Sequence, residues 1–350
     1  MNKTLYIKYL EDTSKKVFPV ILQEINDTIN NELELEKILS FFYSKRADKL
    51  LLKPTLFRLS YELCGGNDFE KYIPLAASFE VLNISSYQAN TAFDNKLGVL
   101  SKEEKDNQFI ASMLSREFAD RFLCQLKNVT DTQPLYQCIS KSNLFIYKAQ
   151  HYDLNLLSLS NSQKCQIYEQ NKTVFLQDYH NRCYFGSGVF SGQTALAGAI
   201  AADANTEKQK ALQSFGEIYG TALHKINDLA DFFPGEERQG KVYQDDFCDI
   251  RNGRLTFPVY ELRTRYSRDY DMIMSLLEKD TIQTEAISNI LIQTDIIDNV
   301  QKTAKEAFVK AKECLNTFET TDFKRMLITL LSVLDSNKFY HRAKTKQNGK

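Results

Sequence analysis

Oxygen-bearing side chains recur along one face of a predicted helix in the second half of the chain. The segment HKINDLADFF, residues 224–233, contains His224, Asn227, Asp228 and Asp231 in an otherwise apolar pattern. Residues three and four positions apart share one helix face, and Asp and Asn are poor helix formers away from helix ends. An exposed face would ordinarily carry Lys, Glu and Gln instead. Their concentration here therefore favours a chemical task over a solvated surface.

A second predicted helix repeats the pattern. In FEVLNISSYQANTAFD, residues 79–94, Asn90 and Asp94 have the same spacing as Asn227 and Asp231. Mg²⁺ binds carboxylate and amide oxygens and keeps its other positions for water and substrate phosphate. Two such helices facing each other across a bundle could therefore hold a diphosphate through magnesium. We predict catalytic roles for three acids (Asp94, Asp228 and Asp231) and magnesium ligation by five residues (Asn90, Asp94, Asn227, Asp228 and Asp231).

Helices must position these residues, because the 3.6-residue apolar period dominates the chain. It is clear in residues 18–43, 109–126 and 323–334, while only 13 glycines and 6 prolines interrupt the 350 residues. We predict a single all-α domain over residues 1–345, followed by a basic tail, residues 346–350. The glycines of GSGVFSG follow no predicted strand, so they do not indicate a dinucleotide site. The neighbouring TALAGAIAADA indicates a close helix crossing through small residues.

Composition excludes several classes of protein. The formal net charge is −1, which gives no field for recruiting nucleic acid. No apolar run reaches the ~18 residues of a membrane-spanning helix, and the charged start does not resemble a secretory signal. The seven cysteines form no CxxC pair, which argues against a disulfide framework or a structural zinc site. We expect a cytoplasmic protein.

Two segments resemble the trans-isoprenyl diphosphate synthases, the polyprenyl synthetase family of the class I isoprenoid synthases. They are FGEIYGTALHKINDLADF and DIRNGRLTFPVYEL, residues 215–232 and 249–262. The second aspartate motif of that family reads FG-x-x-x-G-x-A-F-Q-x-x-D-D-x-x-D and leads into D-x-x-x-G-K-x-T-x-P. The matching residues are Phe215, Gly216, Gly220, Ala222, Asp228, Asp231, Asp249, Gly253, Thr256 and Pro258.

The resemblance implies an all-α isoprenoid synthase bundle around a central apolar cavity. In the family, three Mg²⁺ ions bridge two aspartate motifs to the diphosphate of an allylic substrate. By that resemblance we expect diphosphate contacts from Arg254, Lys53 and Asp249. His224 either hydrogen-bonds near the diphosphate or packs as a structural histidine.

The sequence departs from the family in the first half. The D-D-x-x-D motif becomes Asn90-Thr91-Ala92-Phe93-Asp94, which retains one carboxylate. Leu50 and Leu51 stand at a lysine and an arginine of the family's G-K-R-x-R-P motif, and Lys53 stands at the second arginine. Asn83 replaces a histidine and Gly186 a lysine. Those cations grip isopentenyl diphosphate in the family, so the resemblance implies that this acceptor site is lost.

Cavity residues complete the prediction. Ser85 and Ser86 are small where bulky residues limit chain length in the family, which indicates room for a farnesyl or geranylgeranyl chain. Aromatic faces can stabilise a carbocation by cation–π contact. We expect the aromatic part of the cavity wall to include Tyr87, Phe93, Tyr184, Phe185 and Phe190.

The predicted function is magnesium-dependent ionisation of an allylic prenyl diphosphate of the farnesyl or geranylgeranyl class. Quenching without isopentenyl diphosphate favours a terpene synthase (cyclase). Three alternatives stay open: a prenyltransferase with a non-diphosphate acceptor, a trans-polyprenyl diphosphate synthase, and an inactive regulatory subunit of a heterodimeric prenyl synthase. A homodimer or a heterodimer with a prenyl synthase is the expected assembly.

Overall fold

The described part of the chain is helical. The computed structural model describes residues 3–29, 39, 43, 50–94, 101–127, 129, 131–233, 247–278 and 284–335. These residues form no strand, and their one isolated bridge joins Ser158 to Arg254. The prediction of an all-α fold is confirmed. The basic tail at residues 346–350 lies outside the described residues.

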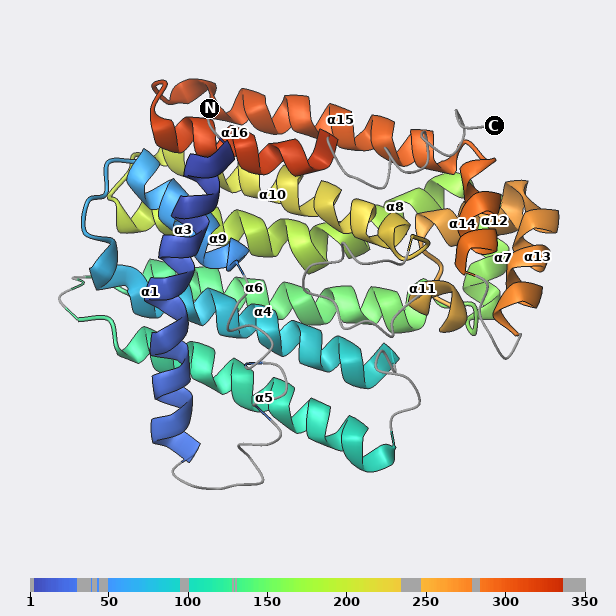
Figure 1. Ribbon diagram of the computed structural model, residues 1–350, viewed down its shortest axis with the longest axis horizontal. Helices are drawn as coiled ribbons and strands as arrows, with labels where there is room; N and C mark the ends of the chain where they lie inside the picture. Colours follow the sequence, from blue (N-terminus) through green and yellow to red (C-terminus); the bar gives the residue numbers. More distant parts are fainter. Residues whose placement is uncertain are drawn as a thin grey trace.

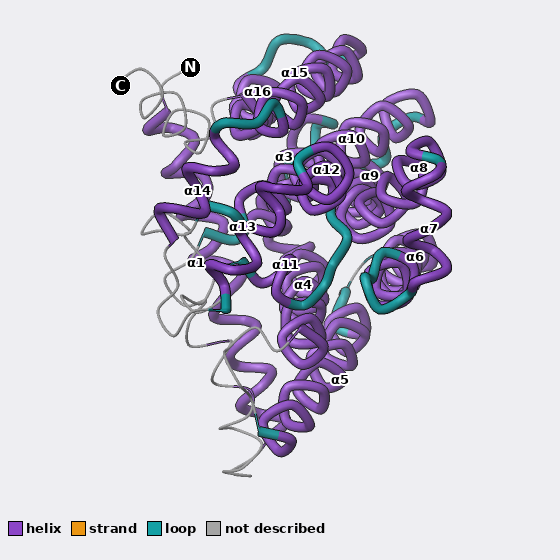
Figure 2. The backbone as a smooth tube through the Cα atoms, turned by 90° about the vertical axis from the view of Figure 1, so that its right-hand side faces the viewer, coloured by secondary structure: helices purple, strands orange, loops and turns teal. Residues whose placement is uncertain are grey.

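Long helices build the body of the molecule and a group of shorter ones covers one end. In Figure 1, α1 crosses a set of helices that run side by side, among them α4, α5, α6, α9, α10 and α15. Figure 2 looks along this set, so that several of its helices are seen end-on. The bounds of the long elements are α1 Lys3–Ile29, α3 Leu52–Leu63, α4 Ile73–Asp94, α5 Lys102–Cys124, α6 Gln133–His151, α9 Val189–Ala201, α10 Thr206–Ala230, α15 Ile296–Cys314 and α16 Asp322–Asp335.

The remaining elements are short. Two of them, η2 and η3, are π-helical turns inserted next to α-helices, a feature that often marks functional sites. The bounds are η1 Phe69–Tyr72, η2 Tyr152–Leu156, α7 Ser162–Gln170, α8 Lys172–Cys183, η3 Tyr184–Gly188, α11 Cys248–Arg251, α12 Phe257–Arg265, α13 Ser267–Leu277, α14 Thr284–Ile292 and η4 Leu315–Thr317.

Close helix contacts depend on small residues. A Cβ atom added to Gly198 of α9 would lie 2.4 Å from the backbone oxygen of Phe57 in α3. One added to Gly220 of α10 would lie 2.2 Å from the backbone oxygen of Ser187 in η3. Both distances are too short for any side chain. The close crossing expected from TALAGAIAADA is therefore present, and α10 is held tightly against η3.

The start of α10 follows from local sequence. Asn205 is its N-cap, and its side-chain oxygen accepts a hydrogen bond from the backbone N–H of Lys208 at 2.9 Å, the usual device for satisfying a free helix N–H. Phe215, Ile226 and Leu229 are buried in the main hydrophobic core. The apolar face of α10 therefore packs into the core, and this packing holds the polar residues at the end of the helix in place.

No helix among the described residues is both long and apolar enough to cross a membrane.

Candidate functional site

Asp228 lies at the buried end of α10 and is already paired. Its Oδ2 atom accepts hydrogen bonds from Nη1 of Arg182 at 2.7 Å and from the hydroxyl of Tyr179 at 2.8 Å. Both donors belong to α8. Burial raises the pKa of Asp228, and Arg182 and Tyr179 oppose that rise by stabilising the carboxylate. Asp228 therefore faces α8.

Arg182 bridges Asp228 to a second carboxylate. Its Nε donates to Oδ1 of Asp153 in η2 at 2.7 Å. Burial alone would lower the pKa of Arg182, but Asp153 and Asp228 hold it well above its ordinary value. Arg254 closes the same cluster, because its Nη1 donates to the backbone oxygen of Asp153 at 3.3 Å. These four charged side chains are buried together.

Asp231 holds the segment that begins at residue 247. Its Oδ1 accepts the backbone N–H of Cys248 at 3.2 Å, and its Oδ2 accepts that of Asp249 at 3.0 Å. These N–H groups belong to the first turn of α11, where no intrahelical acceptor exists for them. Asp231 is 4% exposed. Both of its carboxylate oxygens thus have backbone partners.

The other predicted metal ligands are in different situations. Asn227 is exposed. Asn90 is half-buried, and its Oδ1 accepts a hydrogen bond from Nε2 of Gln150 in α6. Asp94 is the last residue of α4, and its side chain lies outside the described residues. Whether Asp94 and Asp231 converge therefore remains a prediction.

A magnesium ion does not fit the described oxygens as they are arranged. Mg²⁺ requires near-octahedral oxygen ligands and favours carboxylates. Asp228 is ion-paired with Arg182, and the oxygens of Asp231 accept two backbone hydrogen bonds. Asn227 is the exposed residue of the second motif, and its side chain offers a neutral amide oxygen.

His224 lies beside Gly186, the residue that stands at a lysine position of the family motif. A Cβ atom on Gly186 would lie 3.0 Å from Cε1 of the His224 ring. Donor atoms of Cys183, His224 and Asp228 lie within 4.8 Å of one another, a donor set that suits a transition metal. Burial raises the pKa of the Cys183 thiol to about 12, however, and Asp228 is held by Arg182, so these three side chains are not arranged as free ligands.

Lys53 lies in a second polar cluster, at the start of α9. Its ammonium donates to the hydroxyl of Ser191 at 2.7 Å and lies 4.4 Å from the ring centroid of Phe190. Burial lowers the pKa of Lys53 to about 8, and the Glu80 carboxylate opposes the shift. Phe190 also packs on Phe79, with ring centroids 6.3 Å apart. Lys53 therefore has partners within the protein.

The lowered pKa of Lys53 gives a stability prediction. Its ordinary value is 10.5 and its folded value about 8, so between these pH values the unfolded chain binds more protons. Stability should therefore rise with pH across this window. We expect the rise to be smaller in Lys53→Met when urea unfolding is compared at pH values below 8 and near 10. If the free energy of unfolding rose equally with pH in the two proteins, the result would contradict the buried position of the Lys53 ammonium.

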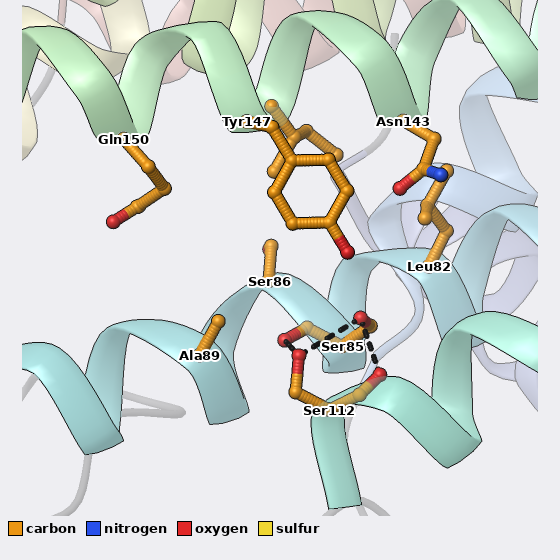
Figure 3. A pocket seen from close by; sticks show the side chains of 9 residues that line it. Leu82, Ser85, Ser86, Ala89, Ser112, Asn143, Tyr147 and Gln150 are labelled. Atoms are coloured by element: carbon orange, nitrogen blue, oxygen red, sulfur yellow. Dashed lines mark hydrogen bonds between the residues drawn. The ribbon is translucent and has the colours of Figure 1, made fainter. Parts of the chain in front are cut away.

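A small pocket lies between α4, α5 and α6 (Figure 3). Its cavity volume is about 10 Å³, and the 270 Å³ of empty space around it includes open solvent. The Ser85 hydroxyl donates to the backbone oxygen of Ser112 at 2.8 Å, and the Ser112 hydroxyl donates to that of Ser85 at 2.9 Å. Ser86 faces Tyr147 of α6 across the pocket (Figure 3). The lining residues are Leu82, Ser85, Ser86, Ala89, Ser112, Asn143, Ile146, Tyr147 and Gln150.

The five predicted aromatic wall residues do not share this pocket. Tyr87 and Phe93 are 43% and 44% exposed, and Phe93 packs on Phe109 of α5 at 6.1 Å. Phe185 packs against Phe145, with ring centroids 5.2 Å apart. Tyr184 is half-buried in η3. Phe190 belongs to the core, as described above. Of the predicted cavity residues, Ser85 and Ser86 line the pocket.

Sequence reasoning missed Tyr179, Arg182 and Asp153. Their only sequence signal is polar character inside helical segments, which is shared by many surface residues. Arg182 lies 46 positions from Asp228 and 29 from Asp153. Nothing in the order of residues indicates that they meet.

Comparisons with known proteins all match prenyl diphosphate synthases or their family model. The family model "Polyprenyl synthetase" matches residues 123–294. The octaprenyl diphosphate synthase of Haemophilus influenzae is 29% identical over 138 residues, which cover 38% of this chain and 41% of that protein. Component 2 of the Bacillus subtilis heptaprenyl diphosphate synthase is 28% identical over 174 residues, 49% of this chain and 47% of that protein. These alignments thus span less than half the length of either relative.

Solved structures show the same fold over nearly the whole chain. The polyprenyl synthase of Caulobacter crescentus, complexed with calcium and isoprenyl diphosphate, superposes with a TM-score of 0.76 at 15% identity, covering 95% of this chain and 98% of that one. The geranylgeranyl pyrophosphate synthase of Corynebacterium glutamicum, complexed with isoprenyl diphosphate and magnesium, gives 0.74 at 12% identity, covering 94% and 98%. At this identity the likeness establishes the fold alone.

Proposed function

We propose that this chain, which belongs to the polyprenyl synthetase family, acts on an allylic prenyl diphosphate as a prenyltransferase of the trans-prenyl diphosphate synthase type. The observation that carries the proposal is the end of α10. There the family's second motif keeps Asp228 in a buried charged cluster and Asp231 buried against the backbone of α11. The relatives named above are prenyl diphosphate synthases. Chain transfer therefore takes precedence over the cyclisation favoured by the sequence alone.

The pocket between α4, α5 and α6 is the place we propose for the prenyl chain. Its walls combine the apolar Leu82, Ala89 and Ile146 with small hydroxyl groups. Its cavity volume of about 10 Å³ is far below the ~300 Å³ at which ligand pockets usually begin. A long chain must therefore displace a side chain from α6, and Tyr147, which is 48% exposed, has room to move.

Ser86→Phe tests this placement. The Ser86 hydroxyl bonds to the backbone oxygen of Asn83 in its own helix, so its loss should cost the fold little, while a phenyl ring should fill the pocket. We expect affinity for farnesyl diphosphate to fall by more than about tenfold, with a smaller loss for dimethylallyl diphosphate. Calorimetric titration measures both. Tyr87→Phe, one position along but outside the lining, is the control, and an unchanged farnesyl affinity in Ser86→Phe would place the chain elsewhere.

A second candidate is a non-catalytic subunit of a prenyl synthase. The Arg182–Asp228 ion pair favours it, because the motif that holds metal in the family is here neutralised by the protein. The Bacillus relative is named as one component of its synthase. On α5, Phe109, Ile110 and Met113 are 46%, 42% and 54% exposed. We propose that this apolar face of α5 contacts a prenyl synthase partner.

One experiment separates these functions. The purified full chain is incubated with Mg²⁺ and geranyl, farnesyl or geranylgeranyl diphosphate, with and without isopentenyl diphosphate, and the products are identified by mass spectrometry. Longer diphosphates formed only with isopentenyl diphosphate support the transferase. Hydrocarbons or alcohols formed without it overturn the transferase in favour of a cyclase. Absence of turnover alone, with activity restored to a family partner, supports the subunit.

A further inference from the structure

The Arg182 side chain occupies the centre of the second aspartate motif. It approaches Asp228 of α10 at 2.7 Å through Nη1 and Asp153 of η2 at 2.7 Å through Nε. The relative exposure of the Arg182 side chain is 7%, and that of Asp228 is 4%. The Tyr179 hydroxyl completes the shell at 2.8 Å from Asp228. The cation thus joins two acids that lie 75 positions apart, as the separations of 29 and 46 from Arg182 require.

We propose that the guanidinium of Arg182 is the resident cation of this motif, so that Asp228 binds no divalent metal. Guanidinium remains charged at any physiological pH and matches carboxylates in a rigid fork. A magnesium ion at Asp228 would have to break a charge-assisted hydrogen bond. It would also stand beside a buried positive charge, in a setting where repulsion is weakly screened.

Binding of Mg²⁺ to Asp228 would cost free energy both at Arg182 and at the metal ion. Without Asp228, Arg182 keeps its hydrogen bond to Asp153 but loses one carboxylate partner, and removing one member of a buried pair leaves an uncompensated charge. Mg²⁺ in turn releases its water reluctantly. Neither cost is offset by Asn227, which offers an uncharged oxygen. The internal cation therefore outcompetes the metal at Asp228.

This assignment concerns Asp228 and stands whichever function the chain has. It leaves the exposed amide of Asn227 available to metal, so an active enzyme would bind its metal on that side. The test therefore measures metal binding directly and does not use turnover.

Binding of Mn²⁺, followed by the loss of its free electron paramagnetic resonance signal, provides the first comparison. We expect the wild-type chain and Asp228→Asn to bind the same number of ions with affinities within about twofold. A loss of one ion, or a weakening of about tenfold or more in Asp228→Asn, overturns the proposal.

Arg182→Gln provides the positive comparison, because the amide keeps hydrogen-bonding capacity and removes the charge. We expect it to gain Mn²⁺ affinity by at least about tenfold over wild type, and the double variant Arg182→Gln, Asp228→Asn to lose that gain. No gain in a folded Arg182→Gln protein contradicts the proposal.

A third measurement needs only the wild-type fold. The Arg182 Nε–H should give a slowly exchanging ¹H–¹⁵N resonance, because it is buried and bonded to Asp153, and its absence from Arg182→Lys assigns it. We expect this resonance to stay in place as Mg²⁺ is added to millimolar concentration. A saturable shift would show that metal displaces the guanidinium.

Discussion

Asp228→Ala is expected to lower the free energy of unfolding by about 3–5 kcal/mol, the usual cost of removing one member of a buried ion pair. The substitution removes the acceptor of both Arg182 and Tyr179 at once. A buried guanidinium then loses one of its two carboxylate hydrogen-bond acceptors, and a buried tyrosine hydroxyl loses its acceptor, which adds a desolvation cost.

Urea unfolding followed by far-ultraviolet circular dichroism measures the change. The matched control is Asp322→Asn, which breaks the exposed Arg325–Asp322 pair at 2.8 Å. Exposed pairs contribute at most about 1 kcal/mol. Equal effects in the two variants would mean that Asp228 is hydrated and that its pairing with Arg182 contributes little. Asp228→Asn should lie between wild type and Asp228→Ala, because an amide oxygen in the place of Oδ2 can still accept both hydrogen bonds but carries no charge to compensate Arg182.

Gly220→Ala is expected to destabilise the protein even though it improves helix propensity. Within α10 the exchange should stabilise an isolated helix by about 1 kcal/mol. The added methyl group would lie 2.2 Å from the Ser187 backbone oxygen and 2.6 Å from the Ser191 hydroxyl. Overpacking of this kind costs about 1–3 kcal/mol or more, and because the nearest atom is backbone, α10 and η3 must separate. We expect a net loss of about 2 kcal/mol.

Thermal and urea unfolding of Gly220→Ala show whether the free energy of unfolding falls or rises. Ser214→Ala, an exposed position on the same helix, reports the propensity gain without a tertiary clash and should leave stability unchanged or slightly increased. A stabilised Gly220→Ala protein would show that α10 and η3 do not approach as closely as described. Since η3 precedes α9 and follows α8, separation here should also weaken the Arg182–Asp228 contact.

Helical periodicity predicted the helices of this protein, and the motifs at residues 215–232 and 249–262 carried its resemblance to the polyprenyl synthetase family. Apolar residues such as Phe215, Ile226 and Leu229 recur at helical spacing, and spacing alone fixes which face of a helix is buried. The same spacing brought His224, Asn227, Asp228 and Asp231 to the end of one helix and carried the resemblance that the family match over residues 123–294 bears out.

The partners of those side chains depend on how the helices pack against one another. Helical periodicity places Asp228 on a face but does not name the group opposite it, and Arg182 reaches it from α8 across a separation of 46 positions. Asp231, expected to face metal, accepts the backbone N–H groups of Cys248 and Asp249. Phe93, expected to face a cavity, packs on Phe109. The physical reason is that local sequence sets the conformation of each helix, whereas a buried charge takes the nearest compensating group that packing of the whole chain brings to it.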